Sequence, residues 1–155
     1  MPQTRVGRKT ARGIVLRGDT VLLMERWRTD ESGKKLHYFS IPGGKIEPTE
    51  IPEITVVREL YEETSLLVRP SRLLARQKFS DGSTNDYFLC DYLSGSAALH
   101  ASAPETQTKD NHSKPRWLKH SELKSLPKDE VYEPIRKLIV AVFENKLPAK
   151  PLSLK

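Results

Sequence analysis

Three glutamates near the middle of the chain have the spacing needed to act together. Glu59, Glu62 and Glu63 stand at positions i, i+3 and i+4, so on a helix their carboxylates share one face. Like charges on adjacent turns repel one another and destabilise a helix unless a cation neutralises them. Carboxylate oxygens are hard ligands that suit Mg²⁺ or Mn²⁺ better than zinc. The spacing therefore indicates a site for Mg²⁺, with Mn²⁺ as the alternative.

The residues around this acidic face supply partners for it. Gly43 and Gly44 allow the backbone to approach a ligand closely and to adopt dihedral angles closed to other residues. Glu50 lies just ahead of the helix, and Arg58 lies within it. We expect a charge-assisted contact between Arg58 and Glu50 that ties the preceding loop to the helix. An acidic helix face alone is usually solvated surface, but this combination favours a functional site.

The segment from Gly44 to Leu66 resembles the Nudix box of the MutT/Nudix hydrolases. That pattern is Gly, five residues, Glu, seven residues, then Arg-Glu-apolar-any-Glu-Glu-any-Gly-apolar, and the chain matches every specified position but one. The exception is Ser65, which stands where the family has its second glycine. That glycine closes the helix, commonly in a left-handed conformation, which costs a serine about 1 kcal/mol. The departure predicts lower stability and not lost chemistry.

The resemblance implies an enzyme that hydrolyses a pyrophosphate bond in a nucleoside diphosphate linked to another group, with a divalent metal as its cofactor. The implied metal ligands are three carboxylates and one backbone carbonyl: Glu59, Glu62, Glu63 and Gly43. Glu50 and Arg58 would orient these groups.

The general base stays open, because family members differ in which acid deprotonates the attacking water. Among the helix residues, Glu59 or Glu62 is favoured. In several relatives the base comes from a long loop, and here Glu105 and Asp110 are the loop acids that could take this role. An ordinary solvated acid is the competing interpretation of each of those two.

Four residues outside the acidic helix are candidates for contacts with the substrate. Lys45 adjoins the two glycines and could meet phosphate oxygens. Trp27 lies between Arg26 and Arg28, so it could stack on a base while the arginines contact phosphates. Packing in the core is the competing interpretation of Trp27. Three substrate classes stay open: a nucleoside triphosphate (oxidised forms included), an ADP-ribose-like compound and a dinucleoside polyphosphate.

Three other functions compete with this interpretation. The basic termini keep an RNA 5′-end pyrophosphohydrolase in view. A non-catalytic nucleotide-sensing or protein-binding module on the Nudix fold usually has a degraded acidic helix, whereas Arg58 and all three glutamates are present here. The third is an acidic-helix α/β domain that binds no metal. Stabilisation by magnesium distinguishes the third from the others, and turnover distinguishes an enzyme from a module.

Hydrophobic runs and turn signals predict an α/β domain of the α+β type. The predicted strands cover 14–16, 21–24, 36–41, 66–79, 85–93 and 116–118. The predicted helices cover 52–64, 121–126 and 131–143, and the longest loop is predicted over 94–114. Strands on both sides of a helix, with further helices near the end of the chain, favour a Nudix-like α/β/α sandwich around a mixed β-sheet.

The charge distribution argues against a nucleic-acid-binding protein. The net charge of the 155-residue chain is +6, but residues 1–12 and 145–155 carry seven basic residues and no acidic one. We expect both ends to be flexible, and a single domain to occupy residues 13–144. The remaining body is close to neutral, so no dedicated nucleic-acid groove is predicted.

Composition also bears on membrane association and cellular compartment. No apolar run approaches the ~20 residues of a membrane span, and the N-terminus lacks the apolar stretch of a secretory signal. Cys90 is the only cysteine, which excludes an intrachain disulfide and makes the cytoplasm the expected compartment. The expected partner is a small-molecule nucleotide. Nudix proteins are often dimers, so a homodimer stays open.

Overall fold

The structure, a computed structural model, describes residues 7–97, 108 and 111–154. The strands in this part of the chain are β1 (Lys9–Arg17), β2 (Thr20–Thr29), β3 (Lys35–Ser40), β4 (Gly43–Lys45), β5 (Leu67–Lys78), β6 (Thr84–Ser94), β7 (Asn111–Lys119) and β8 (Leu152–Leu154). The helices are α1 (Pro52–Thr64), α2 (His120–Ser125) and α3 (Glu133–Phe143). None of these described helices is long and apolar enough to cross a membrane.

The strands form a mixed sheet in the order β3-β2-β1-β6-β5-β8, with β4 paired to β1 and β7 paired to β2. The pairs β1–β6 and β5–β8 are parallel, whereas the remaining pairs are antiparallel. β1 and β2 are joined by the predicted tight turn, in which Gly18 has a φ of 61°. The parallel β1–β6 pairing requires a long connection, and that connection contains α1.

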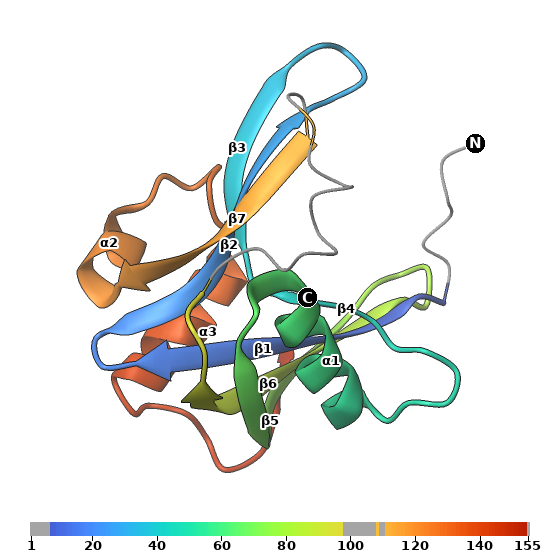
Figure 1. The fold of residues 1–155 in the computed structure, drawn as a ribbon, viewed down its shortest axis with the longest axis vertical. Helices are drawn as coiled ribbons and strands as arrows, with labels where there is room; N and C mark the ends of the chain where they lie inside the picture. Colours follow the sequence, from blue (N-terminus) through green and yellow to red (C-terminus); the bar gives the residue numbers. More distant parts are fainter. Residues whose placement is uncertain (1–6, 98–107, 109–110, 155) are drawn as a thin grey trace.

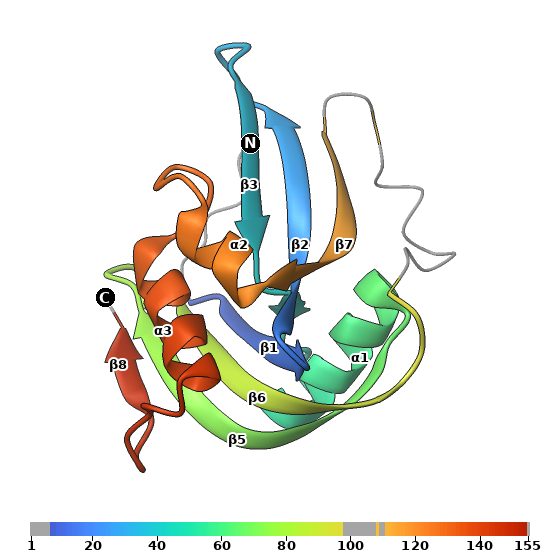
Figure 2. The ribbon, with the colours of Figure 1, turned by 90° about the vertical axis from the view of Figure 1, so that its left-hand side faces the viewer.

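The helices cover opposite faces of the sheet. Figure 2 shows α1 on one side, and α2 and α3 on the other. Side chains alternate along a strand, so neighbouring residues of β1 serve two cores: Ile14 packs with α2 and α3, and Val15 packs with α1. The predicted α/β/α sandwich around a mixed sheet is therefore confirmed (Figure 1).

Helix α1 has the predicted limits and rests closely on the sheet. Pro52 occupies the start of the helix, where its missing N–H leaves no hydrogen bond unmade. The helix buries Val56 and Leu60 against β1 and β6. Gly13 on β1 makes this approach possible, because a Cβ there would lie 3.0 Å from both the Val56 Cγ1 atom and the Cys90 Sγ atom. Cys90 is buried as expected of a small hydrophobic residue.

The structure differs from the sequence-based expectations at the ends of the chain and in the long loop. β1 begins at Lys9, inside the segment expected to be flexible, because residues 9–15 pair in parallel with β6. β8 lies in the C-terminal segment expected to be flexible, and its two leucines pack on the α2–α3 core. β7 begins at Asn111, inside the predicted loop, because its nine residues pair with β2 along its length.

The C-terminus of α1 confirms the predicted left-handed residue. Ser65 has φ 63° and ψ 13°, and its N–H donates a hydrogen bond to the Tyr61 carbonyl at 2.9 Å. A Cβ is disfavoured in this conformation, whereas glycine adopts it without steric cost.

We therefore expect Ser65→Gly to stabilise the protein by about 1 kcal/mol, which raises the melting temperature by about 2–4 °C for a domain of this size. Activity should persist. Ser121→Gly is the control, because Ser121 lies in α2 and is not among the described residues with positive φ. That substitution should lower the melting temperature, and a lower melting temperature for Ser65→Gly would contradict the assignment.

Candidate active site

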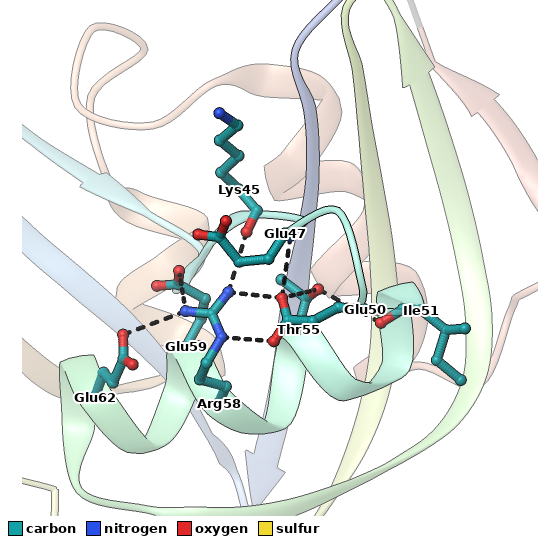
Figure 3. Close-up of polar contacts among 8 residues, drawn as sticks. All are labelled: Lys45, Glu47, Glu50, Ile51, Thr55, Arg58, Glu59 and Glu62. Atoms are coloured by element: carbon teal, nitrogen blue, oxygen red, sulfur yellow. Dashed lines mark hydrogen bonds and ion pairs between the residues drawn. The ribbon is translucent and has the colours of Figure 1, made fainter.

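Arg58 and Glu50 form a bidentate ion pair, as predicted. The Arg58 Nε atom lies 2.7 Å from Glu50 Oε2, and Nη2 lies 2.8 Å from Oε1 (Figure 3). Glu50 also accepts hydrogen bonds from the Glu47 N–H at 3.1 Å and the Thr55 hydroxyl at 3.0 Å. The hydrogen bonds from Arg58 lower the pKa of Glu50 to about 2. These contacts fix the loop before α1 to the side of the helix.

The same guanidinium reaches the acidic face. Its Nη1 atom donates to Glu59 Oε1 at 2.9 Å and lies 3.4 Å from Glu62 Oε2, one turn further on (Figure 3). Glu59 is also pressed against the backbone of Gly44, where an added Cβ would lie 2.4 Å from the Glu59 carboxyl carbon. Burial raises the pKa of Glu59, although Arg58 opposes that shift. A side chain at position 44 would displace the Glu59 carboxylate.

Glu63 is the most strongly perturbed carboxylate of the face. Burial raises its pKa to about 7, against the opposing charge of Arg26 and a hydrogen bond from the Gly43 N–H. Its buried Oε2 atom has no hydrogen-bond partner among the described residues, and the Arg26 Nη2 atom lies 3.6 Å away. A buried carboxylate oxygen without a hydrogen bond is costly. The Arg26 ion pair offsets part of that cost without a hydrogen bond, and a metal ion in direct contact with the oxygen would remove the rest.

The carboxylates fit a divalent metal chemically, but they do not converge in this structure. Among the described residues, no group of three Asp, Glu, His or Cys side chains is arranged to hold a metal ion. Two predicted ligands, Glu59 and Glu62, turn to Arg58, whereas Glu63 faces Arg26. The donors remain of the type that Mg²⁺ prefers, and the unsatisfied Glu63 oxygen is the observation that favours a cation.

The predicted substrate residues of β2 do not form one group. Arg26 turns toward Glu63, and its Nε donates to the Ser40 hydroxyl at 2.6 Å. Trp27 points to the opposite face of the sheet, because side chains alternate along a strand. Its ring stacks on His112 with centroids 4.8 Å apart. Arg28 is exposed on the strand.

The acids predicted as a loop base, Glu105 and Asp110, lie outside the described residues, whereas the predicted phosphate contact, Lys45, lies within them. Lys45 is exposed, and its side chain extends away from Arg58 (Figure 3). Its carbonyl accepts a hydrogen bond from Arg58 Nη2 at 3.1 Å. The backbone of Lys45 therefore belongs to the ion-pair network around α1.

A cavity of about 670 Å³ begins at Arg26, beside the acidic face. Aromatic side chains from several elements contribute to its lining: Tyr38, Phe39, Phe79, Tyr87 and Tyr132. The loop between α2 and α3 forms one wall, and Arg12 of β1 lies beside Arg26 in the lining. The sequence analysis missed Arg12 because it falls in the segment expected to be flexible. Extending the strand pattern back from Ile14 by two residues would have placed Arg12 on the same face.

His37 fastens the loop wall of this cavity to the sheet. Its Nε2 atom lies 2.7 Å from Glu25 Oε2, and its Nδ1 atom lies 3.0 Å from Glu130 Oε1. Both contacts are hydrogen bonds only if His37 carries two N–H donors. Burial lowers the pKa of His37, but the bonds to the two carboxylates raise it overall. The Phe39 N–H also donates to the Glu130 carbonyl at 2.7 Å, so the wall is held at two points.

The Arg58–Glu50 pair predicts a specific pH dependence of stability. The folded-state pKa of Glu50 is about 2, below its ordinary value of 4.5, so the pair stabilises the fold above pH 4.5. That contribution is lost as the pH falls from 4.5 through about 2. We expect Glu50→Gln to lower the melting temperature near pH 7, and the difference from wild type to shrink across this acidic window.

Thermal melts at steps of pH provide the measurement. Glu53→Gln is the control, because Glu53 is exposed on the first turn of α1 and forms no ion pair with the described residues. A melting-temperature difference for Glu50→Gln that stays constant down to pH 2 would show that the pair does not supply this stability.

A family model and several solved structures match the chain. The sequence model of the NUDIX domain matches residues 7–140. A NUDIX hydrolase from Nitrosomonas europaea superposes with a TM-score of 0.71 and 18% identity, covering 99% of this chain and 81% of that one. An ADP-ribose pyrophosphatase from Streptococcus suis has a TM-score of 0.61 and 19% identity, covering 96% and 99%.

A third structure comes from a study of MutT from Aliivibrio salmonicida and Vibrio cholerae. It has a TM-score of 0.64 and 20% identity, covering 86% of this chain and 96% of that one. At these identities the likenesses support the fold alone, whereas the family match includes all of α1. Since that match spans most of the chain, the protein belongs to the Nudix family, as a pyrophosphohydrolase of the Nudix type.

Proposed function

We propose that this protein is a Mg²⁺-dependent hydrolase that cleaves a pyrophosphate bond in a nucleotide, with Mn²⁺ as an alternative metal. The observation that carries the proposal is the complete acidic face of α1, in which the buried Glu63 Oε2 atom has no hydrogen-bond partner among the described residues. The substrate classes proposed are a nucleoside triphosphate, an ADP-ribose-like compound and a dinucleoside polyphosphate.

The residues of the acidic face would divide the work of the reaction. The implied ligands are Glu59, Glu62, Glu63 and the Gly43 carbonyl. A bound metal would neutralise phosphate charge, sharpen the nucleophile and stabilise the leaving phosphate. Glu59 or Glu62 would take the proton of the attacking water. Arg58 and Glu50 would hold the face in position, which agrees with their bidentate contact.

The cavity supplies a place for the nucleoside part of such a substrate. Its volume of about 670 Å³ falls within the range of small-molecule sites, and aromatic residues contribute to its lining. Arg26 lies between this cavity and Glu63, where it could contact a phosphate. One structural neighbour is an ADP-ribose pyrophosphatase, so ADP-ribose belongs in the first experiment.

Hydrolysis of a nucleotide panel tests the proposal. The panel contains canonical and oxidised nucleoside triphosphates, ADP-ribose, diadenosine polyphosphates and 5′-triphosphorylated RNA, each with Mg²⁺, with Mn²⁺ and with EDTA. We expect metal-dependent cleavage of at least one member at a pyrophosphate bond, identified by chromatography of the products. Absence of cleavage, with Mg²⁺ still raising the melting temperature, would favour a non-catalytic module. Cleavage of the RNA alone would favour the RNA 5′-end activity.

Substitution of the acidic face tests the roles of its glutamates. We expect Glu59→Gln and Glu63→Gln each to lower turnover by at least about 10²-fold, because each removes a charge that the metal or the reaction needs. Glu53→Gln, an exposed carboxylate of the same helix, should keep wild-type turnover. Circular dichroism checks that the variants are folded. Near-wild-type turnover of both Glu59→Gln and Glu63→Gln would contradict the assignment of these glutamates.

A further inference from the structure

Arg12 carries a charged group whose position the acidic face alone does not explain. The residue is partly buried on β1, and burial lowers the pKa of its guanidinium. Its Nη1 atom donates a hydrogen bond to the Ile41 carbonyl at 3.0 Å. Among the described residues no carboxylate forms an ion pair with it, in contrast to Arg58 or Arg76. The charge of Glu63 acts on this partly buried cation without forming an ion pair, so an anion in direct contact would stabilise it further.

The surroundings of Arg12 indicate where such an anion would bind. Arg12 and Arg26 both line the cavity, and Arg26 Nη2 is 3.6 Å from Glu63 Oε2. The two arginines therefore stand between the acidic face and the cavity. A nucleotide with its scissile bond at the acidic face and its nucleoside in the cavity would place the intervening phosphate near these arginines.

The cavity floor beside Arg12 is held in place by hydrogen bonds. In the β1–β6 pairing, Arg12 lies opposite Tyr87, and Thr10 lies opposite Asn85. The Tyr87 hydroxyl donates to Gln77 Oε1 at 3.0 Å, and the Thr10 hydroxyl donates to Asn85 Oδ1. Arg12 therefore extends from a strand whose β6 neighbours are held by side-chain hydrogen bonds. Such preorganisation reduces the entropy lost on binding.

We propose that Arg12 binds the phosphate that stays attached to the nucleoside, together with Arg26, and so selects nucleoside 5′-phosphates over nucleosides. The inference rests on the proposed function for the position of the scissile bond. A guanidinium presents a fork of N–H donors that matches phosphate oxygens, and the bond to Ile41 engages only one of them. The phosphate on the product keeps this contact, so Arg12 contributes to binding of the product as well as the substrate.

Binding without metal tests the proposal separately from catalysis. Isothermal titration in EDTA compares the 5′-monophosphates of adenosine, guanosine, cytidine and uridine with the four nucleosides that lack the phosphate. We expect the wild type to bind at least one monophosphate more tightly than its nucleoside. Arg12→Gln should lower the affinity for that monophosphate by about tenfold or more and leave the affinity for the nucleoside within about twofold, as loss of a charged hydrogen bond requires.

Two further variants separate phosphate binding from a structural role. Arg12→Lys keeps the charge but not the forked set of N–H donors, so it should lose an intermediate amount of monophosphate affinity. It also replaces Arg12→Gln in the test if that variant does not fold. Arg17→Gln is the matched control, because Arg17 ends the same strand, is exposed and lies over Tyr92, outside the cavity lining. Its affinities should equal those of wild type.

The outcomes distinguish this inference from the proposed function. Equal weakening of monophosphate and nucleoside by Arg12→Gln would overturn the inference, as would unchanged affinity for both. The absence of monophosphate binding to wild type would overturn it too. If the phosphate-specific loss occurs but no member of the hydrolysis panel is cleaved, the phosphate site stands and the catalytic proposal fails. If cleavage occurs and Arg12→Gln leaves binding unchanged, the reverse holds.

Discussion

The bidentate contact between Arg58 and Glu50 is the interaction on which the rest of the site depends. Through one guanidinium it joins the loop before α1, the backbone of Lys45 and the acidic face of the helix. Without this cation, Glu59 and Glu62 would face each other across one turn with no compensating charge from the helix itself. The pair thus makes the arrangement of like charges compatible with a folded helix.

The acidic face remains in electrostatic conflict at Glu63, where Arg58 forms no contact with the carboxylate. Burial holds the pKa of this group near 7, and one buried oxygen lacks a hydrogen bond among the described residues. A protein under selection for stability alone would replace such a residue with an apolar one. Its position beside two glycines that admit no side chain agrees with the proposed metal site.

What the sequence predicted well is local in the chain. The limits of α1, its Arg58–Glu50 contact and the left-handed Ser65 all follow from spacing within 23 residues, where helix geometry fixes which groups can meet. The same geometry explains why the glutamates share one face. The placement of helices on both faces of the sheet also followed from the order of strands and helices, since the rules for connections between elements leave few alternatives.

What the sequence did not predict depends on partners that are distant along the chain. Trp27 does not act beside Arg26 as predicted, because side chains alternate along a strand and the two residues lie on opposite faces of β2. β8 pairs with β5, and its two leucines pack on the α2–α3 core. No sequence pattern near these leucines predicts that contact. Arg12 lies in a run of basic residues that the sequence analysis assigned to a flexible end. Its place in the cavity lining depends on β6, β2 and the α2–α3 loop, which come together only in the folded protein. Local spacing can therefore indicate the chemistry of the acidic face, whereas the residues that line the neighbouring cavity come together only through tertiary contacts.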